Sequence, residues 1–180
     1  MPLFITGILS RTSAFRSRML SLLKPPLVYV QLSARQIRLR DPRSGHTLAE
    51  PSLVALTRDA KPRIVAVGAQ ARLAAAQDAS IRLYRPLEHP RTQIADFVLT
   101  EQLLKQLLRQ ALKRRWWSPS PMLVMHALDH PEGGLSQIEE RALRELGQAA
   151  GARATHVVQG IELSDKQLLA GAWRSAGQAA

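Results

Sequence analysis

The sequence predicts an α/β domain preceded by an amphipathic helix, and three observations predict it. Short apolar runs of strand composition alternate with helical periodicity over residues 27–158. The strongest helical periodicity lies at 96–115, where apolar side chains recur every three or four positions. Pro25 and Pro26 separate residues 2–23 from this region, because consecutive prolines interrupt a helix. A chain of 180 residues is long enough for one ordinary core.

Composition limits the function classes. The formal net charge of +11 points to an anionic partner, which would be nucleic acid, an anionic membrane surface or an acidic protein. A generally basic surface without a specific partner is the competing interpretation. Cysteine is absent, which excludes disulfides and thiolate metal sites.

Residues 2–23 contain no Asp or Glu and show two faces when drawn as a helix. This is the pattern of a helix that lies on an anionic membrane. A helix packed on its own domain, or a disordered leader, is the alternative. No run reaches the roughly 20 apolar residues of a membrane span, and we do not expect a signal peptide here. The expected membrane-binding residues are Phe4, Ile5, Ile8, Arg11, Phe15, Arg18, Met19, Leu22 and Leu23.

After the proline hinge the pattern predicts four strands, one short helix and a loop. Turns are expected at 41–46, which contains Asp, Pro, Ser and Gly, and at 60–62, which ends in Pro62. An alanine-rich helix is expected over 70–79, and a loop over 80–94. The expected strands are residues 27–32, 37–40, 53–57 and 64–67.

The second half begins with the central helix at 96–115, in which Asp96 stands at the N-terminus and three cations occupy the last turn. A strand at 122–126 follows. Ser136 and Glu139 form a capping-box pattern for a helix over 137–150. A last strand is expected at 156–158, and the tail 173–180 is expected to be weakly structured.

Enzyme motifs for phosphate or dinucleotide binding and a nucleophile elbow are absent. His126 and His130 lie near Asp129, but this segment is expected to run from strand to loop, so no metal site is expected. A basic ridge with two tryptophans could bind phosphates and stack bases. A solvated helix face is the favoured interpretation. The ridge comprises Lys105, Arg109, Lys113, Arg114, Arg115, Trp116 and Trp117.

Five ordered segments carry a resemblance to a known family: residues 49–56, 66–72, 81–104, 118–125 and 136–152. Over about residues 27–172 the chain resembles the N-terminal part of the MreB family of bacterial actin-like cytoskeletal proteins. The resemblance implies a partial actin-like (ribonuclease H-like) fold, which is subdomain IA with subdomain IB inserted. The implied organisation is an N-terminal helix and hinge at 1–26, subdomains IA and IB at 27–175 with IB at approximately 50–95, and a tail at 176–180.

The resemblance also locates a nucleotide site and shows where this chain departs from it. The family's phosphate-binding hairpin reads Asp-Leu-Gly-Thr, and this chain has Gln31, Leu32, Ser33 and Ala34 there. The carboxylate near magnesium, the glycine and the hydroxyl are therefore all replaced. Glu139 matches the family's water-activating glutamate, although its capping role is sufficient reason for a glutamate. The sequence ends before the second lobe that such a site needs, so we expect no ATP hydrolysis.

These observations predict an MreB-like cell-shape protein that works without a nucleotide or other cofactor. We expect it in the cytoplasm, peripherally associated with the inner face of the cytoplasmic membrane. Its expected partners are anionic lipid and full-length filament subunits or cell-elongation proteins. One alternative is a filament subunit that still binds ATP and magnesium. Others are a basic nucleic-acid-binding module, or the product of a decayed gene.

Overall fold

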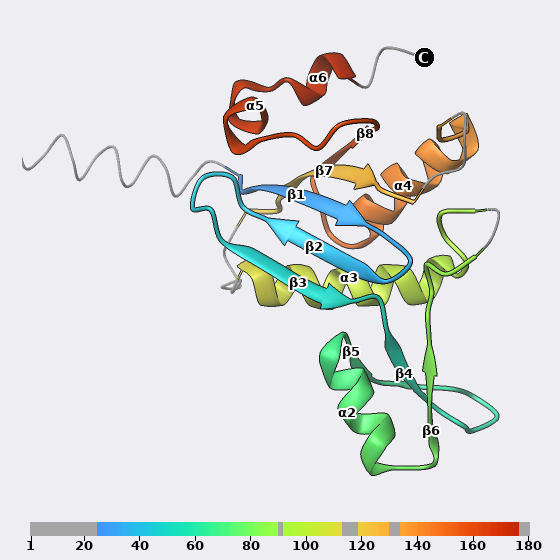
Figure 1. Ribbon diagram of the computed structural model, residues 1–180. Helices are drawn as coiled ribbons and strands as arrows, with labels where there is room; N and C mark the ends of the chain where they lie inside the picture. The colour runs from blue at the N-terminus through green and yellow to red at the C-terminus, as the bar shows by residue number, and fades with distance from the viewer. Residues whose placement is uncertain (1–24, 90–91, 113–118, 130–133, 177–180) are drawn as a thin grey trace, which may run out of the picture.

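The computed structural model describes residues 25–89, 92–112, 119–129 and 134–176, so the expected membrane-binding helix lies outside the described residues. The larger of two sheets has five strands. Figure 1 shows helices on both of its faces and a smaller sheet that extends from one end. The larger sheet has the order β3-β2-β1-β7-β8. Its strands are β1 (Leu27–Leu32), β2 (Gln36–Arg40), β3 (Thr47–Pro51), β7 (Met122–Ala127) and β8 (Ala154–Val158).

Strand β1 lies at the centre of the large sheet, and all six of its residues are buried. It pairs antiparallel with β2 and parallel with β7, which in turn pairs parallel with β8. A strand covered on both faces needs a nearly continuous apolar run, and LVYVQL supplies one. The predicted strands at 27–32, 37–40, 122–126 and 156–158 are all present. Strand β3 was not predicted.

One face of the sheet is covered by α3 (Phe97–Leu112) and α4 (Gln137–Ala149). The buried stripe of α3 includes Leu103, Leu104, Leu107 and Leu108, as the helical periodicity predicts. The carboxylate of Asp96 accepts a hydrogen bond from the backbone N–H of Leu99 at 2.9 Å, as an N-terminal carboxylate should. The predicted residues 113–115 lie outside the described part.

The capping box of α4 is confirmed. The Ser136 hydroxyl accepts from the backbone N–H of Glu139 at 3.3 Å, and the Glu139 carboxylate accepts from the backbone N–H of Ser136 at 3.0 Å. Gly147 sets how closely this helix approaches the sheet. A Cβ at Gly147 would lie 2.7 Å from Cγ2 of Thr155 and 3.0 Å from Sδ of Met125.

The small sheet has the order β5-β4-β6 and carries α2 (Ala69–Gln77). Strands β4 (Val54–Thr57) and β5 (Ile64–Val67) match the prediction. The third strand, β6 (Ile81–Tyr84), contradicts the loop predicted over 80–94. It is four residues long and largely exposed, and Pro86 follows closely, so its apolar signal is weak.

The opposite face of the large sheet is covered by α5 (Asp165–Ala170) and α6 (Trp173–Ala176), as Figure 1 shows. The prediction of a weakly structured tail from residue 173 is therefore wrong at its start. Trp173 is 4% exposed, packs with Leu168 against the sheet, and donates its indole N–H to the Leu168 carbonyl at 3.0 Å. In the described part of the chain, no helix has the length and apolarity to cross a bilayer.

Candidate functional site

The site that the sequence predicts lies where β1 and β7 end. These strands are parallel, so the hairpin after β1 and the loop after β7 lie at the same edge of the sheet. The hairpin is closed by Ser33 and Gln36. The Ser33 backbone N–H donates to the Gln36 carbonyl at 3.0 Å, and the Ser33 hydroxyl accepts from the Gln36 N–H at 3.0 Å. Leu32 ends β1 and is fully buried.

The backbone of Ala34 is bonded on both of its polar groups. Its N–H donates to Oδ2 of Asp129 at 2.7 Å, and its carbonyl accepts from the hydroxyl of Ser52. A carboxylate acceptor makes this a charge-assisted hydrogen bond. The hairpin therefore presents one of its amides to an anion that belongs to the chain itself.

Gln31 lies beside this hairpin, 3% exposed, between Arg38 on β2 and His126 on β7. Its side-chain oxygen has no hydrogen-bond partner in the part of the chain that the structure describes. The side chain is neutral, so it brings no negative charge for a metal ion.

A buried polar chain occupies the same face of the sheet. The Tyr29 hydroxyl lies 2.5 Å from Nδ1 of His126, and Nε2 of His126 lies 3.0 Å from the Gly160 carbonyl. The carbonyl can only accept, so Nε2 carries the proton and Nδ1 accepts from Tyr29. The Tyr29 oxygen in turn accepts from the Leu163 N–H at 3.3 Å.

Burial raises the pKa of the Tyr29 phenol above its ordinary value, and Glu162 acts in the same direction. The hydrogen bond from Leu163 and the charge of Arg40 act against this increase. The phenol therefore stays protonated and can donate to His126. This network joins β1 and β7 to the segment that enters α5.

Glu139, the match to the family's water-activating residue, is engaged in local contacts. Its carboxylate accepts from the Ser136 backbone and hydroxyl at 3.0 and 2.9 Å. The other oxygen accepts from the backbone N–H of Gln93 at 3.4 Å. The side chain thus caps α4 and anchors the segment that leads into α3.

Two further sequence candidates, the basic ridge and the histidine pair, are described only in part. Lys105 and Arg109 are on α3, and the rest of the basic ridge, 113–117, lies outside the described residues. His130 also lies outside them. Within the described ranges no cluster of three or more His, Asp or Glu side chains has the arrangement of a metal site.

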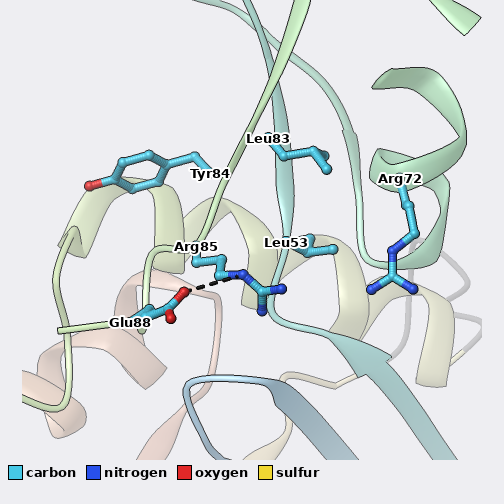
Figure 2. Close-up of a pocket in the computed structure, with 6 residues that line it drawn as sticks. All are labelled: Leu53, Arg72, Leu83, Tyr84, Arg85 and Glu88. Carbon is cyan, nitrogen blue, oxygen red and sulfur yellow. Dashed lines mark ion pairs between the residues drawn. The ribbon is translucent and has the colours of Figure 1, made fainter. Parts of the chain in front are cut away.

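The small sheet carries a pocket of about 400 Å³, drawn in Figure 2. Figure 2 shows the guanidinium groups of Arg72 and Arg85 on either side of Leu53. Arg85 forms an ion pair with Glu88 at 3.2 Å. None of the predicted site residues lines this pocket, which separates it from the hairpin.

The MreB/Mbl protein family matches residues 30–164. The chain belongs to this family. It is 33% identical over 121 residues to the cell shape-determining protein MreB of Haemophilus influenzae, which covers 65% of this chain and 33% of that protein. It is also 33% identical over 119 residues to MreB of Escherichia coli (strain K12).

This MreB/Mbl family member spans about a third of the length of these curated relatives. It is also 38% identical over 91 residues to the uncharacterized protein YjaA of Escherichia coli (strain K12), covering 44% of this chain and 70% of that protein.

Solved structures confirm the predicted partial actin-like fold. MreB5 of Spiroplasma citri bound to ADP has a TM-score of 0.57 and 21% identity, covering 76% of this chain and 38% of that one. A non-polymerising mutant of MamK bound to AMPPNP has a TM-score of 0.58 and 16% identity, covering 76% of this chain and 41% of that one. The family match over residues 30–164 and the curated relatives confirm the resemblance to the MreB family that the sequence motifs suggested.

The Asp129 contact and the Tyr29–His126 pair were not predicted. From the sequence, Asp129 is only a neighbour of His126 and His130. A signal for its contact was present, because Asp129 follows a strand that lies parallel to β1 at the same sheet edge.

Proposed function

We propose that this chain is a cell-shape protein of the MreB/Mbl family that works without bound nucleotide, at the membrane, by contacting filament subunits. The observation that carries the nucleotide independence is the bond from the Ala34 N–H to Asp129. The family resemblance assigns this hairpin to phosphate binding through backbone amides, which suit anions. In this chain a carboxylate takes one of those amides, and it would repel a phosphate that approached the same group.

Gln31 and Ser33 support the same conclusion. Gln31 replaces a carboxylate with a neutral amide, which removes the charge that would attract a magnesium ion. Ser33 adds a Cβ where the family's glycine lets a phosphate approach the backbone. Its hydroxyl and N–H are both bonded to Gln36 within the hairpin. Neither residue is arranged to receive a nucleotide.

ATP binding to the folded chain would raise its melting temperature by mass action. We expect Tm in ATP with magnesium to equal Tm in magnesium alone. A control with an equal concentration of sodium triphosphate removes the effect of ionic strength. An ATP-dependent increase beyond that control would favour the alternative, a filament subunit that binds nucleotide.

Membrane association is supported by the sequence of residues 2–23. This segment has an apolar face and basic residues but no acidic ones, and the whole chain carries a charge of +11. Such a helix binds through buried apolar area plus attraction to anionic lipid. A helix bound in this way would hold the protein peripherally at a membrane, which we propose is the inner face of the cytoplasmic membrane.

Co-sedimentation with anionic liposomes tests the membrane proposal. A Phe4→Asp/Phe15→Asp/Met19→Asp variant should lose binding, because three charges would have to enter the apolar region. The matched control Thr6→Asp/Ser13→Asp/Ser17→Asp adds the same charge to the polar face. This control should retain most of the liposome binding. Equal sedimentation of the apolar-face variant and the wild type would contradict the proposal.

Filament contact is supported by the family and by exposed apolar side chains. Leu128 follows β7 and is 45% exposed, Ile161 follows β8 and is 90% exposed, and Ile138 in the first turn of α4 is 81% exposed. The strands are parallel, so these positions belong to one end of the sheet. Exposed apolar side chains at one end of a sheet are candidates for contact with a protein partner.

Binding to purified full-length MreB from the same cell tests this contact. An Ile138→Asp/Ile161→Asp variant should bind more weakly than the wild type. The control Val65→Asp/Leu73→Asp changes exposed apolar residues of the small sheet and its helix, and should bind normally. If both variants bind as well as the wild type, the proposed surface is wrong. Steeply salt-dependent binding to DNA, without lipid binding, would favour the nucleic-acid alternative.

A further inference from the structure

A second pocket, of about 260 Å³, opens where β1 and β7 begin, between these strands and α5–α6. Its apolar lining comes mainly from Leu168 and Trp173, which are buried, and from Leu169, which is 52% exposed. Pro25 also lines it. The pocket therefore lies at the end of the large sheet opposite to the hairpin and Asp129.

Two arginines border this apolar lining, and none of the residues that line the pocket is acidic. Nη1 of Arg43 donates to the Pro25 carbonyl at 3.1 Å. The guanidinium of Arg174 lies 4.8 Å from the centre of the Trp173 ring. The nearby Asp41 accepts from the Arg43 backbone N–H and from the Ser44 hydroxyl, so its carboxylate already has local donors.

The surroundings of Trp173 are positively charged. The His156 ring packs against the Trp173 ring, tilted by 47° with ring centres 4.3 Å apart. Burial lowers the pKa of His156, and the charges of Arg174 and Arg144 lower it further. The same field would attract an anion to the mouth of the pocket.

Pro25 connects this pocket to the proposed membrane helix. It directly follows residues 2–24, it lines the pocket, and its carbonyl accepts from Arg43. When residues 2–23 lie on a bilayer, the chain places Pro25 within a few residues of the lipid surface. An apolar pocket with cationic edges then faces phosphate groups above acyl chains.

We propose that this pocket binds one anionic phospholipid, with Arg43 and Arg174 at the phosphate and Leu168, Leu169 and Trp173 against the start of the acyl chains. The inference rests on the proposed membrane association. It adds a site in the folded domain that fixes how the domain is oriented on the bilayer.

Partitioning into phosphatidylglycerol vesicles tests the arginines in the full chain. An Arg43→Gln/Arg174→Gln variant should bind about 10- to 30-fold more weakly, because each cation near an anionic surface contributes to binding. The control Arg58→Gln/Arg82→Gln removes the same charge from the small sheet and should bind within about twofold of the wild type. Equal losses in the two variants would show that only net charge matters, and would overturn the site.

Soluble dihexanoyl phosphatidylglycerol, kept below its micelle concentration, separates the pocket from the N-terminal helix. Calorimetry should give saturable binding to the wild type and to the Phe4→Asp/Phe15→Asp/Met19→Asp variant, and much weaker binding to Leu169→Asp. Leu169 is exposed, so this change should leave folding intact. Absence of binding to the wild type would overturn the pocket and leave the membrane helix untouched.

The last experiment measures the binding of inorganic phosphate. Phosphate shares the anionic group with the lipid but has no acyl chains. Binding as tight as that of the short-chain lipid would show a phosphate site and overturn the lipid assignment. Clearly weaker binding of phosphate than of the short-chain lipid supports the lipid assignment.

Discussion

The backbone N–H of Ala34 donates to Oδ2 of Asp129 at 2.7 Å, and the two residues are 95 positions apart in the chain. This bond joins the hairpin after β1 to the loop after β7. An intramolecular carboxylate thus takes an amide of the hairpin that the family uses for phosphate. The proposed loss of nucleotide binding and the retention of the local fold would have the same physical explanation, because the amide keeps an anionic acceptor.

Removal of that acceptor should cost stability. We expect Asp129→Ala to lower the free energy of unfolding by about 1 kcal/mol, less than for a buried charged bond because Asp129 is exposed. Urea denaturation measures this. Asp59→Ala, which removes an exposed carboxylate paired only locally with Arg63, should change it by less than about 0.5 kcal/mol. Equal effects of the two changes would show that the Ala34 bond stabilises nothing.

Tyr29→Phe should be more damaging. It removes the hydroxyl that donates to Nδ1 of His126 and accepts from the Leu163 N–H, and so leaves buried groups unpaired. The expected loss is about 1–3 kcal/mol in the free energy of unfolding. Tyr84→Phe, at a tyrosine that is 36% exposed, is the control and should be nearly neutral. If Tyr29→Phe leaves the free energy of unfolding unchanged, the buried network does not stabilise the fold.

Gly147→Ala separates close packing from helix propensity. Alanine at a helical position normally stabilises by about 1 kcal/mol relative to glycine. Here the new Cβ would meet Thr155 and Met125, so we expect a loss of about 1–3 kcal/mol instead. Thermal melts compared with Gln148→Ala, an exposed neighbour on the same helix, measure the difference. A stabilised Gly147→Ala would show that α4 can move away from β8 without cost.

Stability should fall in mild acid through His156. Its pKa is lowered below the ordinary 6.5 by burial, then by Arg174 and Arg144, so the unfolded chain takes up the proton first. The free energy of unfolding should therefore decrease as the pH falls through about 6.5 toward the folded-state pKa. His156→Gln should show a smaller decrease between about pH 8 and about pH 5.5. If NMR shows that the His156 imidazole titrates above pH 6.5, the predicted direction of the pH dependence of stability is wrong.

The elements with continuous apolar patterns were predictable. LVYVQL in β1 and the leucines of α3 have no competing interpretation, and the Ser136–Glu139 pair defines where α4 begins. Edge strands were harder to predict. Strand β3 contains Glu50 and Pro51, has no fully buried residue, and gives little periodicity.

Helix α5 was missed although its signal exists in the sequence. Ser164 and Gln167 form a capping box, and Gly171 ends the helix with φ of 80°. Only six residues lie between Ser164 and Gly171, and Leu168 is the one buried residue among them, so hydrophobic periodicity could not reveal the helix. The site was predicted in part. The altered hairpin was visible in Gln31, Ser33 and Ala34, whereas the Asp129 contact depends on the pairing of β1 with β7.

Titration calorimetry of the purified full chain with ATP and magnesium tests the central claim of nucleotide independence most directly. We predict no saturable heat up to about 1 mM ATP. A dissociation constant of about 1 mM corresponds to a binding free energy of only about −4 kcal/mol. The Asp129→Ala variant, which frees the Ala34 amide, should also fail to bind tightly, because Gln31 supplies no carboxylate for magnesium. Saturable binding of ATP to the wild type at micromolar affinity would contradict this account.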